Sequence, residues 1–281
     1  MKRGLLAFLA VFALGSGISA SPASAATQVI VTPSNQQGWS SGAPYAETRD
    51  GGAVSFVADP TAPGSPDRGA LELTTPLLPL SAKAQYMHAA ATSLSSVTEL
   101  SYYTKQISAT FPQGDPSYQL QVCLNGATAT PCGFTTLVFE PYQNPAQQLV
   151  VNNVWQQWDV DAGLFWSTRV VTCSNGTILG TPGGPATYTL AQVNSICPNA
   201  TAIAFGVDIG SNNPAYVVRT DLVNFNGTTY NFELDATCRE KDNNKDGNKD
   251  KSNNKDGNKL PKCDKDDSGD NDNSGDDQNS D

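Results

Sequence analysis

The sequence predicts an all-β protein: an antiparallel, jelly-roll-like β-sandwich followed by a disordered C-terminal tail. Between Gln28 and Leu234, short alternating segments rich in Val, Ile, Thr, Tyr and Phe are separated by clusters of Gly, Pro, Asn and Asp, which is typical of sandwiches. No long amphipathic helix interrupts this pattern. From Arg239 to Asp281, large apolar residues are almost absent, so this segment buries too little surface to offset the entropy of folding.

Residues 1–25 have the organisation of a secretory signal peptide. Lys2 and Arg3 precede an apolar run from Leu5 to Leu14, and Ala23-Ser24-Ala25 supplies the small residues of a cleavage site. The apolar run is shorter than the roughly 20 residues that span a bilayer. We therefore predict a secreted, extracellular protein without a transmembrane segment, with a β-sandwich domain over residues 26–237 and a charged tail over residues 238–281.

The strands of the sandwich are predicted from β-branched and aromatic runs bounded by turn residues. They are Thr27 to Thr32, Ala53 to Ala58, Ala70 to Thr74, Thr98 to Ile107, Tyr118 to Leu124, Thr135 to Tyr142, Val154 to Asp161, Ile203 to Ile209 and Tyr216 to Phe225. Leu190 to Ile196 suits a short helical turn. Asn226-Gly227 is a type I′ hairpin signal that leads into a returning strand at Tyr230 to Phe232.

Alternation along two of these strands predicts which side chains enter the core. Successive side chains of a strand point to opposite faces of the sheet. We expect the core set to be Tyr118, Leu120, Val122 and Leu124 in one strand and Ile203, Phe205, Val207 and Ile209 in the other. The intervening residues Gln119, Gln121 and Cys123, and Ala204, Gly206 and Asp208, are expected to face outward.

Six cysteines are spread along the predicted exported chain, with no C-x-x-C pair. An even number in an oxidising compartment favours disulfides over metal binding. Fifteen pairings are possible. The nearest-neighbour set, which closes three local loops, is the favoured one: Cys123 with Cys132, Cys173 with Cys197 and Cys238 with Cys263.

The charge balance is acidic, with 27 Asp and Glu against 17 Lys and Arg. Six basic residues lie between Ala26 and Cys238: Arg49, Arg68, Lys83, Lys105, Arg169 and Arg219. Nucleic-acid binding requires clustered Lys and Arg. This composition therefore argues against a nucleic-acid partner.

The tail contains a repeat, Asn-Asn-Lys-Asp-Gly-Asn-Lys, that begins at Asn243 and again at Asn253. Together with Asp242, the first copy places Asp242, Asn244 and Asp246 at the first, third and fifth positions of an EF-hand-type loop and is similar to the calcium loops of dockerin-like and thrombospondin type 3 repeats. Position 12 is Asn253 rather than a bidentate carboxylate. The alternatives are weak Ca²⁺ binding and a solvated polyampholyte linker.

An aromatic cluster lies before and within one predicted strand. Sugars stack on flat aromatic faces, and polar neighbours orient them. Trp155, Gln157 and Asp159 share one face of the strand, with Tyr142 shortly before, whereas Trp158 on the other face is predicted to be in the core. These four residues, Trp155, Gln157, Asp159 and Tyr142, are the candidate ligand-binding set. The alternative is that both indoles pack inside the sandwich.

The Trp155 to Asp161 motif, Gly38-Trp39 and the runs Gly210 to Tyr216 and Thr229 to Phe232 resemble uncharacterised secreted bacterial jelly-roll proteins. The chain is also loosely similar to non-catalytic carbohydrate-binding modules of that architecture. This resemblance implies a structural Ca²⁺ near the last strand, with Asp221 at the matching position. The alternatives for Asp221 are a salt bridge to Arg219 and exposure to solvent.

No catalytic motif is evident in the sequence. His88 is the single histidine and lacks a Gly-x-Ser-x-Gly elbow nearby. A glycoside hydrolase or polysaccharide lyase would need two carboxylates from separate strands, for which the candidates are Glu99, Glu140, Asp208 and Asp221. The leading hypothesis is non-catalytic binding to an extracellular glycan or cell-surface component. The alternatives are such an enzyme and a structural coat or matrix protein.

Overall fold

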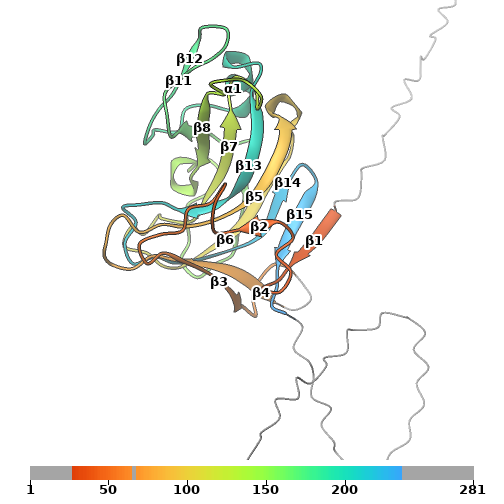
Figure 1. Ribbon diagram of the computed structural model, residues 1–281. Helices are drawn as coiled ribbons and strands as arrows, with labels where there is room; N and C mark the ends of the chain where they lie inside the picture. Colours follow the sequence, from red (N-terminus) through yellow and green to blue (C-terminus); the bar gives the residue numbers. More distant parts are fainter. Residues whose placement is uncertain (1–26, 65–67, 236–281) are drawn as a thin grey trace, which may run out of the picture.

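The computed structural model describes residues 27–64 and 68–235. Two layers of β-sheet enclose one continuous hydrophobic core (Figure 1), which confirms the predicted β-sandwich. The predicted signal peptide, the tail with Asp242, Asn244 and Asp246, and the predicted Cys238–Cys263 pair lie outside the described residues. No helix in the described part of the chain has the length and apolarity to cross a membrane.

The first sheet has seven strands and carries the last strands of the described chain. Its order is β1 (Thr27–Val31), β15 (Thr228–Phe232), β14 (Val217–Phe225), β4 (Gly69–Thr74) and β3 (Ala53–Ala58), with β6 (Leu100–Ser108) joining β14 to β9 (Gln156–Asp159). The pairs are antiparallel except that β1 runs parallel to β15.

The second sheet has six antiparallel strands and carries the site described below. Its order is β10 (Trp166–Ser167), β8 (Phe134–Phe139), β7 (Ser117–Cys123), β13 (Thr201–Ile209), β5 (Ala84–Ser93) and β2 (Trp39–Ser40). Beyond one end lie the small pair β11 (Val171–Thr172) and β12 (Ile178–Leu179) and the helix α1 (Leu190–Ile196) (Figure 1). Two 3₁₀ turns, η1 (Leu94–Ser96) and η2 (Pro141–Gln143), complete the elements.

Strand β7 buries both of its faces. Tyr118, Leu120, Val122 and Leu124 lie in the core as predicted. Gln119 and Gln121 point to the opposite face but are also buried, at 6% and 7% exposure, so the prediction that they face solvent is wrong. Gln121 donates to the carbonyl of Tyr45 at 2.6 Å, because the loop before β3 folds back over this face of the sheet.

Strand β13 departs from simple alternation because it contains a β-bulge between Ala202 and Ala204. A bulge inserts one extra residue and shifts the pattern of side chains. Phe205, Val207 and Ile209 enter the core as predicted, whereas Ala202 takes the place expected for Ile203. Ile203 is half-buried.

One turn, the short helix and two disulfides agree with the predictions from the sequence. Asn226 and Gly227 adopt φ of 51° and 80° in the turn between β14 and β15, as a type I′ turn requires. The helix α1 begins with a capping box between Thr189 and Gln192. Disulfides join Cys123 to Cys132 and Cys173 to Cys197, which confirms two of the three predicted pairs.

Strand β5 was not predicted, although it is the longest strand described. Its sequence, AQYMHAAATS, contains four alanines and lacks Val and Ile, so intrinsic β-propensity gives no signal. Pairing decides its conformation instead, because β13 and β2 flank it on both sides. The short strands β2, β10, β11 and β12 also escaped prediction.

Candidate functional site

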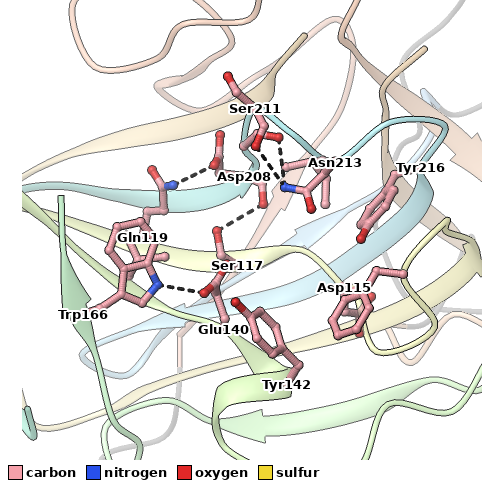
Figure 2. A pocket seen from close by; sticks show the side chains of 15 residues that line it. Asp115, Ser117, Gln119, Glu140, Tyr142, Trp166, Asp208, Ser211, Asn213 and Tyr216 are labelled. Carbon is pink, nitrogen blue, oxygen red and sulfur yellow. Dashed lines mark hydrogen bonds between the residues drawn. The ribbon is translucent and has the colours of Figure 1, made fainter. Parts of the chain in front are cut away.

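A cleft with a volume of about 190 Å³ opens on the face of the six-stranded sheet that points away from the core (Figure 2). Its floor is formed by outward side chains of three adjacent strands: Ser117 and Gln119 of β7, Val138 of β8 and Asp208 of β13. Its walls come from three loops, represented by Phe111, Tyr142 and the segment 210–216. Residues separated by up to about 100 positions thus meet in one hollow.

A row of hydrogen bonds fixes the floor of the cleft. Gln119 Nε2 donates to Asp208 Oδ2 at 2.7 Å, and Gln85 Nε2 donates to Gln119 Oε1 at 2.6 Å. Lys83 Nζ lies 3.6 Å from Asp208 Oδ1. Buried polar groups connected in this way are held in one orientation. Side-chain amides therefore hold the Asp208 carboxyl in position in the free protein.

Glu140 directly follows β8 and is held in place by hydrogen bonds to its Oε2 atom. Trp166 Nε1 donates to Glu140 Oε2 at 2.7 Å (Figure 2). Gln143 Nε2 donates to the same oxygen. Burial raises the pKa of the Tyr142 hydroxyl, and a side-chain hydrogen bond between Tyr142 and Glu140 helps to raise it. Among the described residues, no cation forms a salt bridge with the Glu140 carboxylate. The half-buried Glu140 therefore presents a fixed acceptor to the cleft.

Two aromatic rings form the exposed rim of the cleft. Phe111 and Tyr142 are 46% and 42% exposed. Their ring centroids lie 5.4 Å apart with an interplanar angle of 88°, which is a favourable edge-to-face arrangement. The pair presents apolar ring surface to solvent at the mouth of the cleft.

Burial changes the ionisation of two carboxyls that line the cleft. Asp115 is 9% exposed, and burial raises its pKa to about 8. Thr104 donates to its Oδ2, and Trp158 Nε1 donates to Thr104 Oγ1 at 2.8 Å. Burial also raises the pKa of Asp208 to about 6, a shift that Lys83 opposes and Glu140 reinforces. At neutral pH, Asp115 is protonated while Asp208 is largely ionised.

The structure separates the four residues of the predicted ligand-binding set. Tyr142 lines the cleft. Gln157 and Asp159 are exposed on the other sheet and line a second, shallow depression that also includes Glu99 and Asp161. Trp155 lines neither hollow. It is half-buried, and Lys105 Nζ lies 5.9 Å from its ring centroid. Trp158 is fully buried, as predicted.

Asp221 is fully buried and does not pair with Arg219, so both alternatives considered for it, the salt bridge and solvent exposure, are wrong. Its carboxylate accepts hydrogen bonds from the backbone N–H groups of Gly64, Leu222 and Phe232. Burial raises its pKa to about 7. Arg219 instead pairs with Asp59 and Glu72, each at 2.9 Å. The described residues contain no group of three or more His, Cys, Asp or Glu side chains suited to a metal ion.

The carboxylates considered for catalysis also divide. Glu140 and Asp208 line the same cleft, whereas Glu99 and Asp221 lie elsewhere. His88 sits among aromatic rings, with Nδ1 at 2.7 Å from the carbonyl of Ala89 and Nε2 at 3.1 Å from that of Gln37. Sequence reasoning assigned no role to Asp115 or Phe111. Each lies in a loop without a motif, so only the tertiary structure reveals them.

Comparison with known proteins finds likeness in structure alone. No family model matches the chain, and no curated protein matches it. Two similar solved structures are an arabinose-bound α-L-arabinofuranosidase and a family 11 carbohydrate-binding module from Clostridium thermocellum in complex with a β-1,3-1,4-mixed-linked tetrasaccharide. The first has a TM-score of 0.36 and 8% identity, over 69% of this chain and 23% of that chain. The second has a TM-score of 0.37 and 10% identity, over 68% of this chain and 90% of that chain.

Proposed function

We propose that this protein is a secreted, non-catalytic glycan-binding protein and that the cleft on the six-stranded sheet is its binding site. The observation that carries the proposal is the combination of exposed rings with fixed polar groups in one hollow. Phe111 and Tyr142 offer apolar faces against which a sugar ring can stack. The Glu140 carboxylate offers an acceptor for a sugar hydroxyl at a set position.

The pre-formed geometry supports binding by the free protein. Gln119, Asp208 and Glu140 already hold their positions through hydrogen bonds within the protein. A site that does not need to order its side chains loses less free energy on binding. The cavity is smaller than the roughly 300–1,000 Å³ of pockets for drug-sized ligands, so it suits a ring-sized part of a longer polysaccharide.

Retention on immobilised polysaccharides tests this proposal. Wild type, Tyr142→Ala and Trp155→Ala are compared on a panel of neutral, amino and acidic polysaccharides. We expect Tyr142→Ala to lose about tenfold in affinity, because the variant removes an aromatic ring on which the sugar stacks. Trp155→Ala removes an aromatic residue outside the cleft and should bind like wild type. Equal binding by all three proteins, or binding by none, would reject the cleft as a glycan site.

A hydrolase or lyase is the second candidate function, because Glu140 and Asp208 line one cleft. Paired carboxylates are the usual machinery of glycoside hydrolysis. Against it, Asp208 Oδ1 and Asp115 Oδ1 have almost no accessible surface, so a substrate would reach Glu140 most readily. New reducing ends or unsaturated products from wild type, absent with Glu140→Gln, would favour the enzyme over the binding protein.

Secretion is part of the proposal and is supported by the chemistry of the cysteines. The disulfides Cys123–Cys132 and Cys173–Cys197 are compatible with an oxidising, extracellular compartment. Mass spectrometry of the mature protein tests it directly. An N-terminus at Ala26 is expected, and a retained Met1 would contradict export through the signal peptide.

Calcium binding remains a proposal at two places. Beside Asp221, the buried Asn231 has no hydrogen bond on either side-chain atom within the described residues, so its oxygen would suit a cation together with Asp221 Oδ2. In the tail, Asp242, Asn244 and Asp246 would bind weakly, with a dissociation constant on the order of 10⁻⁴ to 10⁻³ M. Calorimetric titration of the full chain, with Asp221→Asn and Asp242→Asn, separates the two. No heat at millimolar Ca²⁺ would reject both.

A further inference from the structure

The cleft is negatively charged and contains no basic lining residue. Three carboxyls line it, Asp115, Glu140 and Asp208, and the lining includes neither Lys nor Arg. Because Asp115 is protonated at neutral pH, Glu140 and Asp208 carry the charge. An anionic sugar such as a uronic acid or a sulfated residue would lose its hydration there without gaining a countercharge.

The cations nearest the cleft are already paired. Lys83 lies 3.6 Å from Asp208 on the buried floor. Arg49 Nη2 donates to Ser211 Oγ at the edge of the cleft at 3.0 Å, and Arg49 pairs with Glu47 at 2.5 Å and with Asp50 at 3.7 Å. Glu140 forms no salt bridge among the described residues, so its charge is the one in the cleft that a protein cation leaves uncompensated.

The aromatic rim adds a second, independent preference for positive charge. The face of an aromatic ring carries negative electrostatic potential and attracts cations within about 6 Å. Phe111 and Tyr142 meet edge to face at 88°, and both rings line the cleft while partly exposed to solvent. Figure 2 shows Tyr142 standing next to Glu140. An aromatic ring beside a carboxylate that lacks a cationic partner resembles, in its chemistry, the sites that bind ammonium groups.

We propose that the glycan recognised by this cleft carries a free amine, that is, an amino sugar whose ammonium group pairs with Glu140 and lies against the rings of Tyr142 and Phe111. This inference rests on the proposed glycan-binding function and names its ligand class. Glu140 Oε1 would accept from the ammonium while Oε2 keeps its hydrogen bonds from Trp166 and Gln143. A charge-assisted hydrogen bond of this kind is stronger than a neutral one.

Three hexasaccharides with the same β-1,4-linked glucose backbone test the inference because they differ only at the second carbon. Chitosan hexaose carries an amine there, which is an ammonium group in mildly acidic buffer, whereas chitin hexaose carries an acetamide and cellohexaose a hydroxyl. Dissociation constants of the full chain are measured by calorimetry in mildly acidic buffer at physiological salt. We expect chitosan hexaose to bind at least about tenfold more tightly than the other two.

Two charge variants show whether that preference originates in the cleft. Glu140→Gln should reduce the preference for chitosan hexaose to less than about threefold. Glu99→Gln changes the net charge equally at an exposed residue outside the cleft and should retain the full preference. This control separates the cleft from the general attraction of an acidic protein for a polycation.

The possible outcomes separate a failure of the amino-sugar inference from a failure of the proposed glycan-binding function. Equal affinity of wild type for all three hexasaccharides would overturn the inference and leave glycan binding intact. The same holds if Glu140→Gln keeps the preference or Glu99→Gln loses it. Failure to bind any of the three would also overturn the inference, whereas the proposed function is judged separately by the polysaccharide panel and Tyr142→Ala.

Discussion

Gln119 Nε2 donates a hydrogen bond of 2.7 Å to Asp208 Oδ2 on the floor of the cleft. The two residues belong to neighbouring strands, β7 and β13, and are both more than nine-tenths buried. The bond holds a carboxyl group on the face of the sheet that the sequence pattern assigns to solvent. It is therefore a structural link across the sheet that fixes the Asp208 carboxyl at the floor of the cleft.

Replacing the amide tests the structural part of this link. Gln119→Met keeps the length of the side chain but leaves Asp208 Oδ2 and Gln85 Nε2 without their partner. Leaving a buried polar group unpaired costs about 1–3 kcal/mol, so the free energy of unfolding should fall by that amount in urea denaturation. Gln157→Met, at an exposed position, is the matched control and should change it by less than about 0.5 kcal/mol. Equal effects would show that the floor network contributes nothing.

The ionisation of Asp115 predicts a pH dependence of stability. Its pKa is about 8 in the folded protein against 3.8 ordinarily, so the folded state binds more protons than the unfolded state between these values. Its contribution to stability therefore falls as pH rises through this window. Asp115→Asn cannot ionise and should not show this loss.

The comparison is made by urea unfolding from about pH 4 to about pH 8. The unfolding free energy of wild type is subtracted from that of Asp115→Asn at each pH. This difference should increase with pH. The increase should correspond to more than about a tenfold change in the unfolding equilibrium constant, because one pKa unit corresponds to that factor. Asp208 and Asp221 titrate in both proteins and largely cancel. A difference that stays constant with pH would contradict the raised pKa.

Asp59 should be the most sensitive charged residue of the first sheet. It is 1% exposed, and both Lys105 Nζ and Arg219 Nη1 lie 2.9 Å from Oδ2. Burial raises its pKa, but hydrogen bonds from Thr61, Lys105 and Arg219 outweigh burial and hold the pKa well below its usual value. Its contribution is thus present above about pH 4 and is lost at lower pH.

Thermal or urea unfolding of Asp59→Asn at neutral pH measures this contribution. Breaking a buried ion pair on one side destabilises by about 3–5 kcal/mol. Glu47→Gln, which removes one partner of the exposed pair with Arg49, should cost about 0–1 kcal/mol. If both variants lose the same unfolding free energy, the ion pairs of Asp59 stabilise the protein no more than the exposed pair of Glu47 with Arg49.

The two disulfides should stabilise the protein unequally. Cys173 and Cys197 are 24 residues apart in sequence, whereas Cys123 and Cys132 are 9 apart. In the chain-entropy model a longer loop restricts the unfolded state more, and this difference corresponds to about 1 kcal/mol. Replacing each pair by two alanines and measuring urea unfolding tests the order. Larger destabilisation from the shorter loop would contradict the entropic explanation for these bridges.

Sequence alone determined the fold class, the Asn226-Gly227 hairpin, the short helix and two disulfides. These features depend on local patterns: alternation of side chains, turn residues and the spacing of cysteines. Such patterns survive in the fold because neighbouring residues in the chain decide them. Where a bulge interrupted β13, the prediction for Ile203 failed, since a bulge inserts a residue without a distinct sequence signal.

Only the tertiary structure decided the site. Gln121 is buried because a distant loop covers its face of the sheet, and β5 is a strand because two strands flank it. Likewise, Asp115, Glu140 and Asp208 meet through the register of β7, β8 and β13 rather than through any motif. Burial, charge pairing and pKa depend on what surrounds a side chain in space, and the order of residues along the chain does not specify that.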